Sequence, residues 1–313
     1  MDVRVGAIDC GTNSIRLLVA DAVPGGLRDL HREMRIVRLG EGVDATGEFA
    51  PAALARTEAA LSDYVKTMRA HGVERVRMVA TSAARDAANR DEFFAMTARL
   101  LGEVVPGTVA EVITGTQEAE LSFRGAVGEL DPAAGPFVVV DLGGGSTELV
   151  LGESGVTASY SADIGCVRIK ERFLQTDPPT AAEIGEARAL VRERLDDALR
   201  AVPVAHAKTW VGVAGTFTTL AALAHGLQVY DPQLIHLSRT GFGDLLAMCD
   251  TLIRMSAADR AALGPMHEGR ADVIGGGAII VEELAAVLGE LAGIDELVVS
   301  EHDILDGIAL SIA

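Results

Sequence analysis

The sequence lacks any apolar run long enough to cross a membrane. A transmembrane helix needs about 20 consecutive apolar residues, and the best candidate, 211–227, is interrupted by glycine, threonine and histidine. The N-terminus also lacks the pattern of a signal peptide, because Asp2, Arg4 and Asp9 break its short apolar stretch. These absences predict a cytoplasmic protein with no membrane partner.

Cysteines and aromatic residues are few. Cys10, Cys166 and Cys249 lie far apart in the sequence and form no C-x-x-C pair of the kind that binds metals. Without an export signal we expect reduced thiols, and for Cys166 a packing role. Aromatic residues make up 4% and apolar residues 49% of the chain, which is typical of a globular protein whose elements pack through small side chains.

Positive charge comes almost entirely from arginine, since only three of the 27 basic residues are lysine. The formal net charge of −18 argues against a protein that binds nucleic acid or anionic membranes non-specifically. Arginine nevertheless binds phosphate oxygens better than lysine does, because its planar guanidinium group donates two hydrogen bonds side by side. We therefore expect an anionic substrate to be held by a few arginines within an otherwise repulsive surface.

An internal repeat places the same short motif at two points of the chain. Residues 5–19 read V-G-A-I-D-C-G-T-N-S-I-R-L-L-V, and residues 137–151 read F-V-V-V-D-L-G-G-G-S-T-E-L-V-L. Setting Asp9 on Asp141 also aligns the glycine, serine and leucine positions that follow. Each copy is predicted to be an apolar strand ending in Asp, a tight turn that needs glycine, and a second strand leaving in the opposite direction. The repeat predicts a duplication, and therefore two similar domains.

Strands alternate with helices along the rest of the chain. Strands are expected at 14–21, 28–39, 76–80, 109–113, 209–213 and 296–299, and helices at 51–71, from 83, at 116–127, at 180–200, after 215, at 271–289 and at the C-terminus. This alternation predicts an α/β fold in which helices cover mixed sheets. Glycines and prolines cluster between 125 and 136, which predicts a domain boundary there.

Three acidic residues are candidates for binding a metal ion. Asp9 and Asp141 each lie at the end of a predicted strand, where α/β folds place ligands, and Glu148 lies on the strand that leaves Asp141. Facing one another across a cleft, the two aspartates would hold a hydrated Mg²⁺. The alternative is that each Asp only caps its turn by accepting backbone amides. The presence of the pair favours the metal site.

Two glycine-containing loops are candidates for binding phosphate. The first is a run of small residues whose backbone amides can surround an anion. It consists of Gly143, Gly144, Gly145 and Ser146. In the second, Gly215 and Thr216 follow a predicted strand and begin a helix, whose N-terminus also suits an anion.

Seven segments, taken together, resemble the exopolyphosphatase / guanosine pentaphosphate phosphohydrolase (Ppx/GppA) family. They are I-D-C-G-T-N-S-I-R-L at 8–17, A-T-S-A-A-R at 80–85, T-G-T-Q-E-A at 114–119, V-D-L-G-G-G-S-T-E-L at 140–149, G-C-V-R at 165–168, G-V-A-G-T at 212–216 and the stretch 270–277. The combination of D-x-G-T-N-S-x-R-L with D-x-G-G-G-S-T-E is highly specific, and the match runs essentially from end to end.

The resemblance implies a duplicated, ribonuclease-H-like architecture of the actin and sugar-kinase superfold, with an active-site cleft between two domains. It implies an N-terminal domain at 1–128, a C-terminal domain at 129–301, and a terminal helix at 302–313 that packs back on the first domain. A homodimer is expected from the family alone.

The resemblance also implies roles for individual residues. Glu118 matches the catalytic carboxylate that activates the attacking water, and Asp141 and Glu148 match acidic residues needed for the metal and for catalysis. The positions where the family holds phosphates are matched by Asn13, Arg85, Ser146, Cys166 and Arg270, and Ser14 joins them as the repeat counterpart of Ser146. In-line phosphoryl transfer needs such parts, namely a positioned water, a metal and donors to the non-bridging oxygens.

The implied activity is that of an exopolyphosphatase, which removes the terminal phosphate of inorganic polyphosphate with Mg²⁺, or with Mn²⁺ in its place. The segment 300–307 reads S-E-H-D-I-L-D-G, without the arginine that many members carry there, and the chain stops at 313 without the helical domains of longer members. Together with the acidic charge, these departures predict a preference for short chains and low processivity.

Three other functions stay open at this point. One is a guanosine pentaphosphate 5′-phosphohydrolase, and a second is an ATP-dependent small-molecule kinase whose nucleotide would lie at 212–216. The third is a non-catalytic polyphosphate sensor, which the set of Glu118, Asp141 and Glu148 disfavours, because a pure binder needs no base. The seven histidines show no H-x-x-x-H spacing, and we expect them to be structural or to face solvent.

Overall fold

The computed structural model describes residues 3–313 and divides the chain into two compact units. The first unit runs up to Gly125 and takes up the chain again from Ile304, and the second comprises Ala126–Asp303. The divisions thus lie at 125/126 and 303/304, where the sequence prediction has 128/129 and 301/302. None of the helices described is long and apolar enough to span a membrane.

The first unit is built on a five-stranded sheet in the order β3-β2-β1-β4-β5. Its strands are β1 (Arg4–Cys10), β2 (Ser14–Val23), β3 (Gly26–Ile36), β4 (Arg75–Ala80) and β5 (Glu111–Val112). Its helices are α1 (Val43–Thr46), α2 (Pro51–His71), α3 (Ser82–Asp86), α4 (Arg90–Leu101), most of α5 (Gly115–Val127) and α13 (Ile304–Ile312). Strand β2 pairs antiparallel with β1 and β3, whereas β1 pairs parallel with β4.

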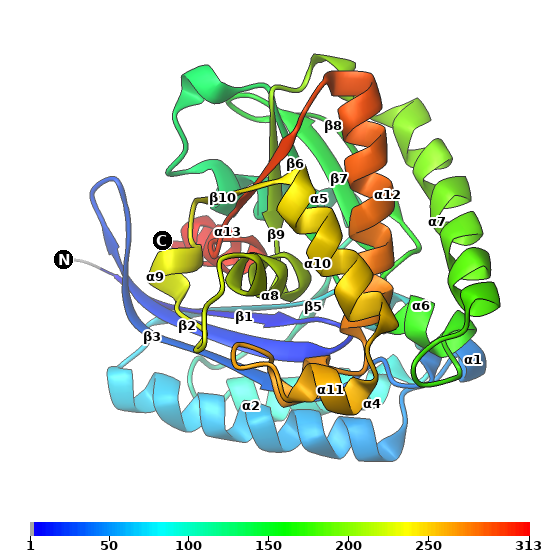
Figure 1. The fold of residues 1–313 in the computed structure, drawn as a ribbon. Helices are drawn as coiled ribbons and strands as arrows, with labels where there is room; N and C mark the ends of the chain where they lie inside the picture. The colour runs from blue at the N-terminus through cyan, green and yellow to red at the C-terminus, as the bar shows by residue number, and fades with distance from the viewer. Residues whose placement is uncertain (1–2) are drawn as a thin grey trace. The chain divides into compact units, whose positions relative to one another are not determined.

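Both faces of this sheet are covered. Successive residues of a strand point to opposite faces: along β1, Ile8 and Cys10 pack into the cluster that contains residues of α2 and α4. Val5 and Ala7 pack with α13 in a separate cluster. Figure 1 shows α2 running along the sheet. The C-terminal helix therefore completes the core of the first unit.

The second unit is built on a six-stranded sheet in the order β10-β11-β9-β6-β7-β8. Its strands are β6 (Phe137–Leu142), β7 (Thr147–Gly152), β8 (Val156–Ala162), β9 (Thr209–Val213), β10 (Ser238–Gly241) and β11 (Glu296–Val299). Its helices are η1 (Pro132–Ala134), α6 (Cys166–Phe173), α7 (Ala181–Ala201), η2 (Val204–His206), α8 (Gly215–Ala224), α9 (Pro232–Ile235), α10 (Phe242–Arg254), α11 (Ala257–Ala261), η3 (Glu268–Arg270) and α12 (Ile274–Ala292).

The two sheets share one topology. The order β8-β7-β6-β9-β11 in the second unit reproduces β3-β2-β1-β4-β5 in the first, and β10 is an added antiparallel edge strand. In both units the first two strands of the repeat form an antiparallel hairpin, β1–β2 in the first unit and β6–β7 in the second. The first strand of each hairpin also pairs in parallel with a later strand, β1 with β4 and β6 with β9. This confirms the predicted duplication and the α/β, ribonuclease-H-like fold class.

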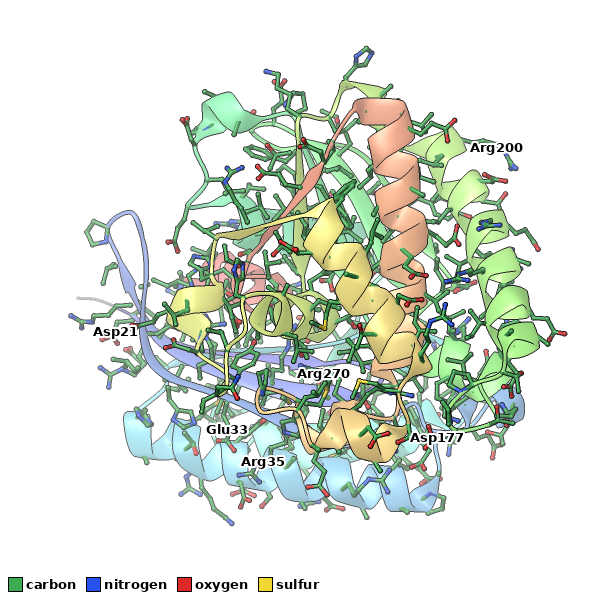
Figure 2. The ribbon with its side chains drawn as sticks, viewed as in Figure 1. Asp21, Glu33, Arg35, Asp177, Arg200 and Arg270 are labelled. Carbon is green, nitrogen blue, oxygen red and sulfur yellow. The ribbon has the colours of Figure 1, made fainter. Side chains whose placement is uncertain are left out.

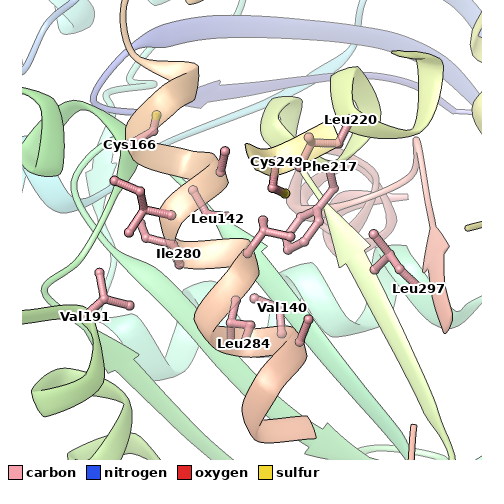
Figure 3. Close-up of a cluster of buried hydrophobic side chains, with 14 of the residues drawn as sticks. Val140, Leu142, Cys166, Val191, Phe217, Leu220, Cys249, Ile280, Leu284 and Leu297 are labelled. Carbon is pink, nitrogen blue, oxygen red and sulfur yellow. The ribbon is translucent and has the colours of Figure 1, made fainter. Parts of the chain in front are cut away.

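The core of the second unit lies between its sheet and helices α8, α10 and α12 (Figure 3). Val140 and Leu142 of β6 meet Phe217 of α8 and Ile280 of α12 in one buried cluster. Trp210 lies edge-on to Phe217, with ring centroids 5.6 Å apart. Because β6 is buried along its whole length, its sequence is a continuous apolar run up to Asp141 and not an alternating one.

Several predicted helix boundaries are confirmed by their capping geometry. Helix α2 has Pro51 in its first turn and ends at Gly72, which takes the left-handed conformation with φ of 67°. Helix α7 begins with the predicted capping box, in which Thr180 and Glu183 exchange hydrogen bonds.

Other predicted boundaries are wrong. The helix expected from 83 is two helices, α3 and α4, because the side chain of Asn89 is hydrogen-bonded to the backbone of Phe49 and holds the chain between them. The helix expected at 271–289 begins at Ile274, after the 3₁₀ turn η3. Helix α10 is absent from the prediction, although its buried Leu245, Cys249 and Leu252 recur at helical spacing.

The segment that departs from the family pattern packs within the first unit at its C-terminal end. Asp306 is buried, and one of its carboxylate oxygens accepts a hydrogen bond from Arg32 of β3 at 3.1 Å. Leu305 is buried in the cluster formed with α13. The acidic residue Asp306, in the segment where the usual arginine is absent, therefore has a partner in its own unit.

The buried carboxylate of Asp21, on β2, binds one arginine on each of the two neighbouring strands, β1 and β3. Asp21 of β2 accepts hydrogen bonds from Arg4 Nε at 2.7 Å and from Arg28 Nη2 at 2.6 Å, and Figure 2 labels it on the sheet. Only 4% of its side chain is exposed. The Arg4 hydrogen bond, with that of Arg28, lowers the pKa of Asp21 to about 2.

We expect Asp21→Asn to lower the free energy of unfolding at neutral pH, with a deficit that depends on pH. The pKa of Asp21 is lower in the folded state than the value of about 3.9 for an unfolded chain, so its contribution is present above pH ~4 and is lost as the pH falls towards 2. In urea unfolding between pH 7 and 2, the difference in the free energy of unfolding between variant and wild type should become smaller below pH ~4. Asp29→Asn, at an exposed position of β3, is the control. A deficit that does not change with pH would contradict this account.

Candidate active site

The two repeated hairpins close with the same hydrogen bond. The amide of Gly11 donates to the carbonyl of Ser14 at 2.9 Å, and the amide of Gly143 donates to the carbonyl of Ser146 at 3.0 Å. The predicted equivalence of the two turns is therefore confirmed at the level of single backbone atoms. The loops between these pairs are the places where backbone amides can face a ligand.

In the second hairpin, the N-terminus of α6 holds the carbonyl groups of the turn 143–146. The amide of Cys166 donates to the carbonyl of Gly143, and the amides of Val167 and Arg168 donate to that of Gly144, at 3.0 to 3.1 Å. A Cβ atom at Gly165 would overlap the backbone of Gly144, so the two segments meet only because that residue is glycine.

The opposite side of the turn 143–146 carries amide groups. Within residues 3–313, no acceptor is found for the amides of Gly144, Gly145 and Ser146. Three such N–H groups in succession could surround a phosphate oxygen. Phosphate binding by the triple glycine stays a prediction of the sequence.

Asn13 and Ser14 occupy the corresponding turn of the first unit. The carbonyl of Asn13 accepts hydrogen bonds from the amides of Val37 and Arg38 at 3.0 and 2.9 Å. Its side-chain oxygen Oδ1 is buried and has no hydrogen-bond partner among the residues described. A buried side-chain amide in this state is expected where a ligand completes its hydrogen bonding.

Glu118 lies in the first turn of α5. That helix begins with reciprocal hydrogen bonds between Thr114 and Gln117, a capping box that fixes its first turn. Glu118 is 7% exposed, and its Oε2 lies 2.7 Å from Nη1 of Arg85. Arg85 Nη1 also donates to the carbonyl of Ile113 at 3.0 Å. The structure therefore brings together two residues that the sequence places 33 positions apart.

Asp9 and Asp141 have different partners across their hairpins. Asp9 is opposite Arg16, whose Nη2 lies 2.7 Å from Asp9 Oδ2. Asp141 is directly opposite Glu148, so the side chains of two carboxylates share one face of the sheet. Arg16 Nε and Nη2 both donate to the same oxygen of Asp9, Oδ2. Asp9, Asp141 and Glu148 all stay predicted metal ligands.

The donor set at Asp141 and Glu148 fits a hard divalent cation. Both residues are almost fully buried, at 6% and 1% exposure, and like charges directly opposite one another destabilise a sheet. Ser161 Oγ donates to Glu148 Oε1 at 2.7 Å and orients that carboxylate. Two buried carboxylates supply the oxygen ligands that Mg²⁺ prefers and a charge that such an ion would compensate.

Arg270 lies against the first turn of α8 (Figure 2 labels Arg270). Its Nη1 donates to Thr219 Oγ1 at 2.8 Å, and that hydroxyl donates to the carbonyl of Gly215 at 2.7 Å. A Cβ atom at Gly215 would overlap the guanidinium group. Glycine at this position is therefore required for Arg270 to reach the helix N-terminus, where an anion is favoured.

The loop before α8 is strained. Ala214 has φ of 71° and ψ of 175°, a region that is essentially restricted to glycine and costs about 1–3 kcal/mol for other residues. Strain of this kind clusters at functional sites. It immediately precedes Gly215 and Thr216, which the sequence predicts to bind phosphate.

Cys166 and Thr216 both pack against α12 at a glycine. A Cβ atom at Gly277 would overlap the Thr216 side chain and would lie 3.4 Å from Cys166 Cβ. Burial raises the pKa of the Cys166 thiol to about 11, so the thiol stays protonated at neutral pH. Cys166 therefore packs at the start of α6 and is no thiolate nucleophile. Its place among the phosphate-binding residues stays a prediction.

Arg260 is a residue of this site that the sequence prediction misses. It is 4% exposed, and its guanidinium donates to the carbonyls of Met255 and Ala271 at 3.0 and 2.7 Å. Ala271 follows Arg270, so Arg260 fixes the backbone that carries that arginine. Burial lowers the pKa of Arg260, and the charges of Asp177 and Asp272 oppose this effect. No sequence signal separates this buried arginine from the many exposed ones.

Comparison with known proteins identifies relatives that match nearly the whole chain. A model of the Ppx/GppA phosphatase family matches residues 18–312. The chain is 68% identical to exopolyphosphatase 2 of Mycobacterium tuberculosis, over 99% of this chain and 98% of that protein. It is similar to the crystal structure of an exopolyphosphatase-like protein, with 42% identity, a TM-score of 0.93, and coverage of 99% and 98% of the two chains. A guanosine-5′-triphosphate,3′-diphosphate pyrophosphatase of Vibrio cholerae is 32% identical over 71% of this chain and 44% of its own length.

Proposed function

The chain belongs to the Ppx/GppA phosphatase family, and from this membership we propose that it is an exopolyphosphatase that hydrolyses the terminal phosphate of inorganic polyphosphate. The observation that carries the proposal is end-to-end identity of 68% to a protein of that name. Both candidate phosphate loops and the acidic residues of the sequence prediction lie at the ends of strands and helices of the described fold, which supports the same activity. Release of inorganic phosphate from polyphosphate is the assay that tests it.

The reaction assigned to the chain is attack of a water oxygen on the terminal phosphorus. Glu118 accepts the proton of that water, and the bond between the terminal phosphorus and its bridging oxygen breaks, which releases inorganic phosphate and a chain shorter by one unit. Arg85 holds the Glu118 carboxylate in one position through their ion pair. In this position the Arg85 guanidinium could also donate a hydrogen bond to a phosphate oxygen.

Charge on the phosphate oxygens is met by donors from the backbone and from arginine. The amides of the turn 143–146 and the guanidinium of Arg270 are fixed before any substrate binds, because α6 and Thr219 hold them. Preorganised donors of this kind stabilise the charge that develops in the transition state. A Mg²⁺ ion held by Asp141 and Glu148, or Mn²⁺ in its place, would neutralise further phosphate charge when bound.

Glu118→Gln should keep the fold and lose roughly 10²–10⁴-fold in turnover, because an amide cannot accept the proton of the water. The measurement is phosphate release at saturating substrate, together with a thermal unfolding curve. Glu120→Gln, at an exposed position of the same helix, is the matched control. Turnover close to wild type in Glu118→Gln would remove this residue from the mechanism.

Asp141→Asn should raise the Mg²⁺ concentration needed for half-maximal activity, because one of two charged ligands is lost. In the presence of a chelator, the free energy of unfolding should not fall, since the substitution relieves repulsion from Glu148. Glu153→Gln, exposed after β7, is the control. If the metal dependence is unchanged and only stability falls, Asp141 is a turn cap and not a metal ligand.

The charge of the protein bears on the preferred chain length. Many arginines are committed to carboxylates: Arg4 and Arg28 contact Asp21, and Arg35 contacts Asp63 at 2.6 Å (Figure 2 labels Asp21 and Arg35). The formal net charge is −18. A long polyanion would therefore be repelled except near Arg85, Arg270 and their neighbours.

This repulsion predicts that the enzyme releases its substrate after each cut, so that long chains shorten together and short chains are cleaved at least as well. Gel electrophoresis of a partial digest measures this, and added salt should weaken the repulsion, since the Debye length is about 8 Å at physiological ionic strength. Full-length chains persisting beside only fully degraded product would show processive cleavage and refute the account.

A guanosine pentaphosphate 5′-phosphohydrolase is the second candidate, favoured by the similarity to a pyrophosphatase acting on guanosine-5′-triphosphate,3′-diphosphate. Both substrates end in a phosphoanhydride, so the same groups would serve either one. Parallel assays with the two substrates separate the candidates. The proposal also includes a homodimer, which the family resemblance implies, and a cytoplasmic location, which the sequence analysis predicts.

A further inference from the structure

We propose that Glu129, His236 and His302 form a binding site for a divalent transition-metal ion of the Zn²⁺ type, distinct from the Asp141–Glu148 pair. Each side chain offers one ligand atom, and these atoms lie within 4.8 Å of one another. Two imidazoles and one carboxylate form a donor set that Zn²⁺ uses in proteins. Mg²⁺ prefers oxygen ligands, so this cluster selects a different class of metal.

The cluster is assembled from three distant segments of the second unit. Glu129 follows α5, His236 caps the end of α9, and His302 follows β11. Glu129 Oε1 lies 2.8 Å from His302 Nδ1, and Glu129 Oε2 lies 3.5 Å from His236 Nε2. The imidazole rings are 4.4 Å apart between centroids. The carboxylate therefore faces a nitrogen of both rings at once.

These distances suit a tetrahedral ion after small adjustments. Zn²⁺ bonds to nitrogen and oxygen of about 2.0–2.1 Å place neighbouring ligands about 3.3 Å apart. The Glu129–His236 separation is already close to that value, and the Glu129–His302 separation has to open slightly. The side chain of Glu129 is 57% exposed and that of His302 is 34% exposed, so an ion can enter from solvent and keep a water as its fourth ligand.

The turn that carries His302 is fixed by its own hydrogen bonds. Ser300 Oγ donates to the carbonyl of His302 at 2.7 Å and accepts from its amide at 3.1 Å. The ligand on this segment is therefore held in place before an ion arrives, which reduces the entropic cost of binding.

Binding at His236 requires one rearrangement. The amide of Glu301 donates to His236 Nδ1 at 3.2 Å, so the neutral ring carries its proton on Nε2. Coordination through Nε2 moves that proton to Nδ1, with no net gain or loss of protons by the ring. The Glu301 amide then loses its acceptor, so the His236 ring has to turn away from that amide as the ion binds.

The experiment is a titration of chelator-treated protein with Co²⁺, a spectroscopic substitute for Zn²⁺. We expect the visible absorption band of a four-coordinate Co²⁺ ion at one equivalent per chain, and its loss on addition of Zn²⁺. The double variant His236→Gln/His302→Gln should lose the band and bind Zn²⁺ at least about 100-fold more weakly, measured by competition with a chromophoric chelator.

Three further variants make the result specific. Glu129→Gln keeps the size of the side chain and should weaken Zn²⁺ binding at least about 10-fold, even if the double variant folds poorly. His206→Gln, an exposed histidine outside the cluster, and Asp141→Asn should both keep the band. Absence of a four-coordinate band in the wild-type protein, or a band that survives in both Glu129→Gln and the double variant, would overturn the proposal.

Discussion

The candidate phosphate loop of the second unit depends on the hydrogen bonds between the N-terminus of α6 and the turn 143–146. A peptide group that offers its carbonyl to one side offers its N–H to the other. The α6 amides take the carbonyls of Gly143 and Gly144, so the amides that follow these two carbonyls point away from α6. Glycine at 165 and 277 is required by the same packing, since a Cβ atom at either position would meet neighbouring residues.

Duplication supplied two hairpins, and one difference between them separates their chemistry. Opposite the strand-ending aspartate, the first hairpin has Arg16 and the second has Glu148. In the first hairpin, Arg16 Nε and Nη2 both donate to one oxygen of Asp9, Oδ2. In the second, Asp141 and Glu148 place two buried carboxylates opposite one another. The same backbone motif therefore presents an acid–base pair in one copy and an acid–acid pair in the other.

Arginine carries out three different tasks in this chain. Arg260 is buried and holds backbone carbonyls, Arg85 is paired with the candidate base Glu118, and Arg270 lies along a helix N-terminus. Its planar fork suits all three, because it can donate several hydrogen bonds in fixed directions. Burial and pairing, and not the number of arginines, decide which of them can meet a phosphate.

The sequence by itself determined the repeated strand–turn–strand units, the α/β class and the glycine-rich turn 143–146, because each is encoded locally. Strand periodicity, the glycines of a tight turn, and capping pairs such as Thr180 and Glu183 act over a few residues and can be read directly. The helix break at Asn89 could not be predicted in this way, since its cause is a hydrogen bond to Phe49, 40 positions away.

Only the tertiary structure decided which side chains meet. Asp9 looks equivalent to Asp141 in the sequence, and the ladder register, which sets Arg16 opposite one and Glu148 opposite the other, distinguishes them. Arg260 and the Glu129–His236–His302 cluster carry no local motif at all. The partners of Arg260 are 5 and 11 positions away, but only the folded loop shows that its guanidinium is buried against their carbonyls. Glu129 lies more than a hundred positions from His236 and from His302, so only the folded chain brings these three side chains together.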